Sequence, residues 1–292
     1  MNSQDLSQDI YDLYDYYVHG KMERRQFIEK LSVYAVGGLT VPSILEYLLP
    51  KYAQTLQVNP NHRNLSSDYI EYNSPKGGGT IKGLLSTPAN SIRKLPGIIV
   101  VHENRGLNPH IEDVGRRAAL DGFVSLAPDA LTPLGGYPGT DDEGRLMQRK
   151  RDRFEMLEDF IAALEFLAAH PSCNGNVGVV GFCFGGWISN MMAVRCPTLK
   201  AAVPFYGGQP EDKDVEQIQS KILIHYGALD KRVNAGWPDY EKALIKYGKQ
   251  YRSYTYPDVN HGFHNDSTPR YNETAAKLAW KRTIEFFQEH LG

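Results

Sequence analysis

The chain has 292 residues, of which 41% are hydrophobic, and a formal net charge of -2 at pH 7. This length is enough for one large buried core, and the nearly balanced charge gives no electrostatic reason to expect nucleic acid as a partner. No apolar run approaches the roughly 20 residues of a membrane span, so we also expect no membrane insertion.

The first 58 residues are predicted to form an N-terminal helical arm, because apolar side chains recur at helical spacing from Leu6 to Tyr17. A second interpretation starts from Arg24 and Arg25, which precede a moderately apolar run over residues 31–49. A twin arginine before an apolar run resembles a Tat-type export signal, although Glu46 interrupts this one. A cytoplasmic protein with a helical arm and an exported protein therefore both stay open.

Residues 59–68 are polar and contain Pro60, which predicts a linker before a main domain over residues 69–292. In that domain we expect strands at 69–72, 80–85, 97–102, 123–127, 177–181, 201–205, 221–226 and 251–256. The expected helices are 111–120, 145–169, 185–194, 236–246 and 271–290. The first two strands flank a glycine-rich turn and predict an antiparallel edge hairpin. The later alternation predicts an α/β fold, with a mainly parallel sheet and helices on both faces.

The stretch from Gly181 to Gly185 predicts a sharp turn with Cys183 at its centre, between a buried strand and a helix. Such a turn holds the central side chain above the sheet, and the following helix N-terminus favours a thiolate. The other two thiols, Cys173 and Cys196, occupy ordinary positions, and three cysteines without a C-x-x-C pair indicate neither a disulfide framework nor a zinc site. A buried structural cysteine in a tight turn is the alternative interpretation of Cys183. No metal and no cofactor is expected.

Two later strand ends supply an acid and a base for a thiol nucleophile. Asp230 follows the strand at 221–226, and His261 follows the strand at 251–256. Parallel strands place both loops at the sheet edge where Cys183 also lies, in the chain order nucleophile, acid, histidine. His261 would take the thiol proton, and Asp230 would hold the imidazole tautomer. Asp258 is a second candidate for the acid.

With these residues in place, the sequence resembles the dienelactone hydrolase family, which has the α/β-hydrolase fold, over roughly residues 83–291. The strongest marks are the segments 102–107, 181–186 and 260–263 together with Asp230. The resemblance implies a Cys-His-Asp triad and a thiol-gating glutamate at Glu103. It also implies that oxyanion N–H groups come from Asn104 and from Phe184, whose N–H the turn itself directs toward the nucleophile. A salt bridge of Glu103 with Arg105 or Arg116 is the alternative for that acid.

The resemblance also implies that two arginines bind a substrate carboxylate. For the first, the loop and helix start offer Arg145, Arg149, Arg151 and Arg153. Arg145 is our candidate among them, and Arg105 and Trp237 are further substrate-binding candidates. No arginine directly follows His261-Gly262-Phe263, and Arg270 is the next one along the chain. Because of this departure, a broader ester or lactone substrate and the specific dienelactone both stay open.

The leading hypothesis is therefore a hydrolase that cleaves a carboxylic ester or lactone, a small molecule, through a thioester on Cys183. The alternative from a different class is a redox-sensing thiol protein on the same scaffold, with Cys183 passing through a sulfenic acid. A third role concerns the arm, which could join subunits into a homo-oligomer.

Overall fold

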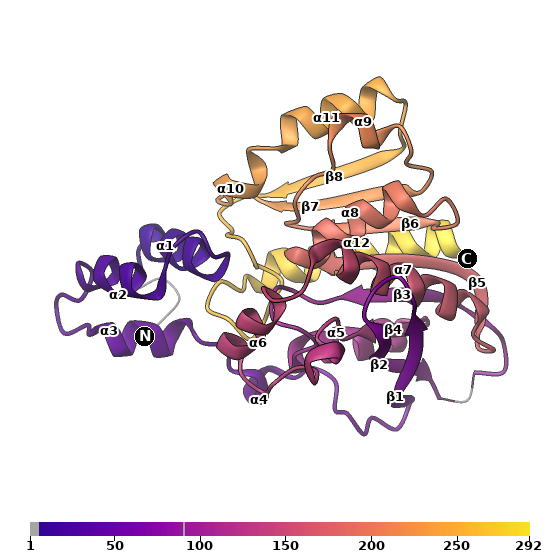
Figure 1. Ribbon diagram of the computed structural model, residues 1–292, viewed down its shortest axis with the longest axis horizontal. Helices are drawn as coiled ribbons and strands as arrows, with labels where there is room; N and C mark the ends of the chain where they lie inside the picture. Colours follow the sequence, from indigo (N-terminus) through magenta and orange to yellow (C-terminus); the bar gives the residue numbers. More distant parts are fainter. Residues whose placement is uncertain (1–5, 90) are drawn as a thin grey trace.

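The computed structural model describes residues 6–89 and 91–292. Its eight strands are β1 (Leu65–Ser74), β2 (Gly79–Pro88), β3 (Leu95–Val101), β4 (Val124–Pro128), β5 (Cys173–Phe182), β6 (Ala201–Phe205), β7 (Lys221–Gly227) and β8 (Tyr251–Tyr256). They form one sheet in the order β1-β2-β4-β3-β5-β6-β7-β8 (Figure 1). The helices of the main domain are α5 (Pro109–Leu120), α6 (Asp141–Gln148), α7 (Arg153–Ala169), α8 (Phe184–Arg195), α9 (Asp212–Val215), α10 (Lys231–Asn234), α11 (Trp237–Lys246) and α12 (Glu273–Leu291).

The sheet confirms the predicted α/β fold. Strand β2 is antiparallel to both β1 and β4, whereas the six strands from β3 to β8 run parallel to one another. The edge hairpin is longer than predicted, because β1 begins at Leu65, inside the segment assigned to the linker. All parallel strands thus end at one edge of the sheet, and the loops after them lie close together.

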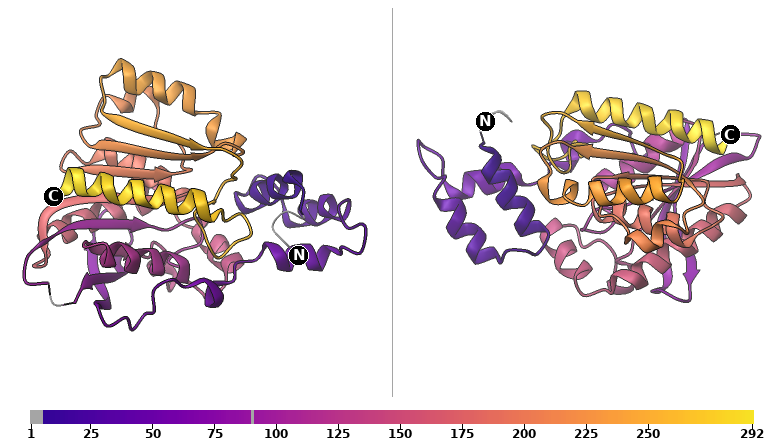
Figure 2. Two further views of the ribbon diagram at one scale, coloured as in Figure 1. Left: turned by 180° about the vertical axis from the view of Figure 1, so that it is seen from behind. Right: turned by 90° about the horizontal axis from the view of Figure 1, so that it is seen from above.

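Side chains that alternate along each strand build two cores, one on each face of the sheet. In β3, Ile98 and Val100 pack with α5 and α12, while Ile99 and Val101 pack with α7, α8 and α11. Figure 2 shows these helices covering the opposite faces. This two-sided burial explains the continuous apolar run of β3 and makes the sheet a rigid support for its loops.

One predicted helix is wrong in extent. Residues 145–169 are not a single helix, because α6 ends at Gln148 and α7 begins at Arg153. Asp152 caps α7 by accepting hydrogen bonds from two backbone N–H groups, and Arg151 between the helices donates to Ala130 O and to Asp159. These tertiary contacts outweigh the local preference for a continuous helix.

The N-terminal segment contains α1 (Gln8–Val18), α2 (Arg24–Ser32), α3 (Val41–Leu48) and the short α4 (Tyr52–Thr55). The first three helices share a hydrophobic cluster of their own and lie beside the strand ends near α6 and α10 (Figure 1). Arg24 and Arg25 open α2, and the apolar run after them is divided between α2, a turn and α3. In the described part of the chain, no helix has the length and apolar character to cross a bilayer. Arm and linker bounds, cytoplasmic location, export and subunit joining all stay predictions.

Gly185 gives a testable account of the turn between β5 and α8. A Cβ at this position would lie 2.4 Å from Val101 O and 2.8 Å from His102 O, both rigid backbone atoms. We expect Gly185→Ala to lower the free energy of unfolding by about 3 kcal/mol, measured by urea denaturation. Gly115→Ala in α5 is the matched control, since its Cβ would meet nothing closer than Ser125 Oγ at 3.4 Å. Equal losses in both variants would contradict this account.

Candidate active site

Cys183 occupies the sharp turn that the sequence predicts. Its backbone has φ 58° and ψ -109°, a conformation that non-glycine residues rarely adopt, and its N–H donates to Phe205 O at 3.1 Å. The side chain is 8% exposed and stands directly before the first residue of α8. The strained turn therefore holds the sulfur at the N-terminus of a 12-residue helix, where the helix dipole favours negative charge.

Asp230 and His261 meet at the same edge of the sheet. Asp230 follows β7 and accepts from Val233 N at 3.1 Å, while its second oxygen lies 2.6 Å from His261 Nδ1. Burial raises the pKa of Asp230, but the charge and hydrogen bond of His261 outweigh it and hold the pKa below its usual value. Asp258, the other candidate acid, is exposed. The short contact orients the imidazole with its Nε2 free to act on a substrate.

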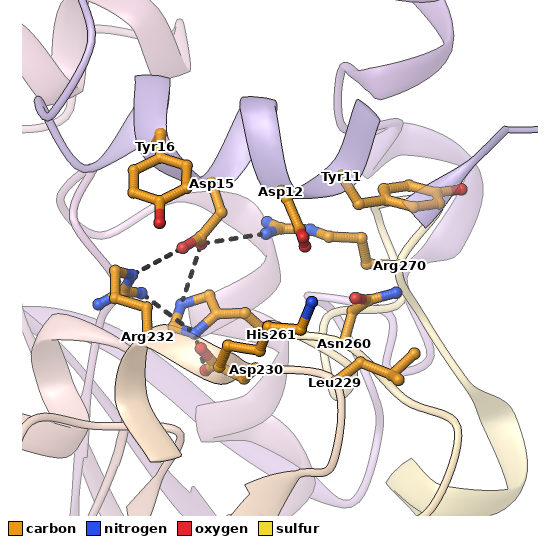
Figure 3. A pocket seen from close by; sticks show the side chains of 11 residues that line it. Tyr11, Asp12, Asp15, Tyr16, Leu229, Asp230, Arg232, Asn260, His261 and Arg270 are labelled. Carbon is orange, nitrogen blue, oxygen red and sulfur yellow. Dashed lines mark hydrogen bonds and ion pairs between the residues drawn. The ribbon is translucent and has the colours of Figure 1, made fainter. Parts of the chain in front are cut away.

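A second carboxylate approaches His261 from the arm. Asp15 Oδ1 in α1 lies 4.0 Å from His261 Nε2, and Asp15 also pairs with Arg232 at 2.7 Å and Arg270 at 3.7 Å (Figure 3). Together these groups line a small cavity of about 60 Å³. Among the described residues, His261 Nε2 is buried without a hydrogen-bond partner. The arm thus closes one side of the site with a negative charge.

The sulfur itself contacts a histidine that sequence reasoning missed. His19 Nε2 lies 3.1 Å from Cys183 Sγ, and His19 Nδ1 lies 3.1 Å from Asp15 Oδ1. Asp15 and His19 are four residues apart, so helical spacing places them on one face. That spacing was the sequence signal that could have paired these two residues. The local sequence does not indicate which surface of the main domain the arm covers.

Three donor atoms at this place could hold a metal ion. The ligand atoms of His19, Cys183 and His261 all lie within 4.8 Å of one another. Each histidine also has a carboxylate at its other ring nitrogen, as histidine ligands of zinc commonly do. A thiolate with two imidazoles suits a thiophilic ion such as Zn²⁺. The expectation of no metal stays a prediction.

Glu103 is buried, and its Oε2 accepts a hydrogen bond from Asn265 Nδ2 at 2.8 Å. Burial raises its pKa, but the nearby positive charge of Arg105, His110 and Arg270 holds the pKa below its usual value. The hydrogen-bond partner found for the Cys183 sulfur is His19 instead. Thiol gating by Glu103 therefore stays a prediction.

The two expected oxyanion residues both line the pocket that contains the sulfur. Phe184 opens α8 directly after Cys183. Asn104 lies in the loop after β3, where its side-chain Nδ2 donates to Val18 O of the arm at 2.8 Å. The arm therefore fixes a loop from which an oxyanion N–H is expected.

The pocket over Cys183 has a volume of about 500 Å³ and six basic residues in its lining, of which Arg145, Arg151 and Arg232 pair with carboxylates outside it. Its basic lining residues are Lys21, Arg145, Arg149, Arg151, Arg153 and Arg232. Among the described residues that line it, none is acidic. Trp187 adds an aromatic wall, with the guanidinium of Arg153 3.6 Å from its ring centre. The pocket is thus suited to a small anion with an apolar part.

The three substrate-binding candidates have different positions. Arg145 lines this pocket, with its guanidinium over the Tyr17 ring and paired with Asp142. Arg105 is not among the lining residues, because its guanidinium is buried in a salt bridge with Asp141.

Trp237 also lies apart from the pocket lining, and it packs against Tyr226, Tyr240 and Tyr251. These positions give no support to direct substrate contact by Arg105 or Trp237. Trp187, four residues after the nucleophile, is the tryptophan that lines the pocket.

Two family models match the sequence. One, described as the dienelactone hydrolase family, covers residues 81–291, and the other, described as YqhI-like, covers residues 1–36. A Synechocystis protein named "Putative carboxymethylenebutenolidase" is 32% identical over 229 residues, which cover 72% of this chain and 92% of that protein. Protein usf of Aquifex pyrophilus is 34% identical over 229 residues, 74% of this chain and 96% of that protein.

Solved structures show the same likeness. A dienelactone hydrolase-like promiscuous phosphotriesterase from metagenomic libraries superposes with a TM-score of 0.68 at 25% identity, over 78% of this chain and 100% of that one. A dienelactone hydrolase from Anabaena variabilis has a TM-score of 0.60 at 19% identity, over 78% of this chain and 100% of that one, which shows the shared fold alone.

Proposed function

Because this chain belongs to the dienelactone hydrolase family, we propose that it hydrolyses a carboxylic ester or lactone with Cys183 as the nucleophile. The sulfur attacks the carbonyl carbon, a thioester forms as the alcohol leaves, and water then cleaves the thioester. His261, oriented by Asp230, moves protons during this cycle. The backbone N–H groups of Phe184 and Asn104 stabilise the oxyanion.

One observation carries the proposal. A strained cysteine at a helix N-terminus shares a pocket with an imidazole whose Nδ1 lies 2.6 Å from a buried carboxylate. This is the constellation that acyl transfer to a thiol requires, namely a nucleophile, a base and a group that orients the base.

Capture of the thioester tests this proposal directly. The protein is mixed with an excess of an activated aryl ester, quenched in acid within the first turnovers, and measured by intact mass. We expect an added acyl group that peptide mapping assigns to Cys183, and hydroxylamine should remove it. An acyl group on another side chain, or turnover without any acylation of Cys183, would overturn the mechanism.

The cationic pocket lining supports an anionic substrate. With six basic residues and no acidic one among its described lining residues, the pocket favours an ester or lactone that carries a carboxylate. The apolar face of Trp187 suits the hydrocarbon part of such a molecule.

Arg145 gives a prediction about this preference. We expect Arg145→Ala to raise KM about tenfold for an ester with a free carboxylate, because a charge-assisted hydrogen bond is lost. The KM for the corresponding neutral methyl ester should change little. Arg195→Ala is the control, since Arg195 pairs with Glu158 at the surface. A tenfold rise for both substrates would contradict charge recognition by Arg145.

The redox-sensing alternative is not favoured by any feature of the site. Cys196 follows the far end of α8, and a 12-residue helix is roughly 18 Å long. The two sulfurs therefore cannot form a disulfide without unfolding this helix. A free thiol that lacks a nearby resolving cysteine is better suited to catalysis than to reversible sensing.

A further inference from the structure

The hydrogen-bond partner of the nucleophile comes from the arm. His19 Nε2 lies 3.1 Å from Cys183 Sγ, although the two residues are 164 positions apart in the chain. The contact found for His261 Nε2, by comparison, is Asp15 Oδ1 at 4.0 Å. A ring nitrogen of His261 also lies within 4.8 Å of the sulfur, but the imidazole at hydrogen-bond distance from the thiol is that of His19.

The surroundings of His19 assign its tautomer. Its Nδ1 lies 2.7 Å from the carbonyl oxygen of Asp15 and 3.1 Å from the Asp15 carboxylate, and both of these groups only accept hydrogen bonds. Nδ1 therefore carries the ring proton. The lone pair on Nε2 then faces the sulfur, and the guanidinium of Arg232, a donor, lies 3.3 Å from the same nitrogen.

Charged groups lie on several sides of His19. Its ring lies 3.1 Å from the Asp15 carboxylate on one side and 3.1 Å from the Cys183 sulfur on the other. The guanidinium of Arg232 places a positive charge 3.3 Å from His19 Nε2. The His261 ring stands edge-on with its centre 5.0 Å away. Asp15 is the acidic group among these neighbours, and it pairs with Arg232 at 2.7 Å and with Arg270 at 3.7 Å.

We propose that His19, oriented by Asp15, is a second catalytic histidine that takes the proton of the Cys183 thiol before attack. This inference rests on the proposed ester or lactone hydrolysis. The S–H bond breaks, the proton moves to His19 Nε2, and the electron pair stays on sulfur. The thiolate then forms a C–S bond with the carbonyl carbon. When the C–O bond breaks, His19 returns the same proton to the leaving oxygen.

His261 then serves the second half of the cycle. Its Nε2 takes a proton from water as the water oxygen bonds to the thioester carbon. The C–S bond breaks, the acid leaves, and His261 gives that proton to the sulfur, which restores the thiol. Each imidazole thus has its own carboxylate, Asp15 for His19 and Asp230 for His261.

The same end of α1 also holds the oxyanion loop. Val18, next to His19, accepts a hydrogen bond through its carbonyl oxygen from the side chain of Asn104. The arm therefore contacts both the nucleophile and the loop expected to bind the developing oxyanion. This pair of contacts favours a catalytic arm over one that only covers the pocket.

Thiol alkylation against pH in the full-length protein tests the assignment. We measure the rate of iodoacetamide reaction with Cys183 by mass spectrometry, from about pH 6 to about pH 9. At about pH 6 we expect His19→Ala to react about tenfold more slowly than the unaltered protein, because the thiol has lost its proton acceptor. At about pH 9 the two rates should converge. Imidazole in the buffer should restore the lost reactivity.

Three variants serve as controls. His261→Ala should slow alkylation less than His19→Ala does, because His261 acts after the thioester forms. Gln8→Ala removes a hydrogen bond between the arm and Asn260 but keeps His19, so it tests loosening of the arm alone. His62→Ala removes a histidine outside the site. The inference would be overturned if His261→Ala changed the alkylation profile and His19→Ala did not. It would also be overturned if Gln8→Ala gave the same alkylation profile as His19→Ala.

Two different outcomes distinguish failure of this inference from failure of the proposed function. If Cys183→Ala keeps full ester turnover, the proposed function fails and the role of His19 fails with it. If Cys183→Ala is inactive but His19→Ala alkylates like the unaltered protein at every pH, only the role of His19 fails. Melting temperatures of all variants, compared with the unaltered protein, identify any variant that has lost its fold.

Discussion

Cys183→Ala is expected to lose at least about 10³-fold of kcat for an activated aryl ester, because no thioester can form without the sulfur. The strained turn and the pocket should persist, since alanine fills less space than cysteine and the backbone geometry is held by Gly185 and by the bond to Phe205 O. Steady-state kinetics, with circular dichroism to verify the fold, measure this effect.

The other two thiols provide matched controls. Burial raises the pKa of Cys196 to about 12, and burial also raises the pKa of Cys173. Both thiols therefore stay protonated near neutral pH, and neither lines the pocket. Cys173→Ala and Cys196→Ala should keep turnover within about twofold when folded. Full activity in Cys183→Ala would end the proposed mechanism.

His261→Ala is expected to lower kcat about 10³-fold, because the base that activates water in thioester hydrolysis is gone. If the two imidazoles divide the cycle as proposed, this variant should also accumulate the acylated form of Cys183. A burst of released alcohol followed by slow turnover, together with the added mass, measures both effects. An equally slow release of alcohol in the first turnover would contradict a role limited to thioester hydrolysis.

Asp230→Asn extends the same test without removing the imidazole. An amide at this position can donate to His261 Nδ1, which favours the wrong tautomer and leaves Nε2 protonated. We expect a loss of about 10²-fold or more in kcat with little change in KM. Asp258→Asn is the matched control, because that carboxylate is exposed and should be dispensable. Loss in the control with none in Asp230→Asn would reverse the assignment.

Local pattern was enough to predict the sheet and the nucleophile turn. Strand β3 is buried on both faces, so its apolar run is unbroken, and the glycines that bracket Cys183 sit where a Cβ would collide with backbone. Asp230 and His261 follow strands that are parallel, and parallel strands deliver their following loops to one edge. These features depend on short stretches of sequence and on general rules of topology.

Local sequence pattern could not predict the contacts between elements that are far apart in the chain. The break before α7 depends on the hydrogen bonds that Arg151 donates to Ala130 O and Asp159. Periodicity alone predicts a continuous helix at this place. Likewise, Glu103 was expected at the thiol, but in the structure it accepts from Asn265. A side chain's hydrogen-bond partner is decided by the final arrangement of loops, which local propensity does not encode.

The sequence by itself determined the α/β sheet, the strained cysteine and the acid and histidine downstream, because each follows from periodicity, turn chemistry or chain order. Only the tertiary structure decided that His19 and Asp15 reach the sulfur and His261. The arm folds around its own apolar cluster, and its docking depends on a few polar contacts such as Asn104 with Val18. Such contacts join residues far apart in the chain, and no periodic pattern in either segment specifies the other.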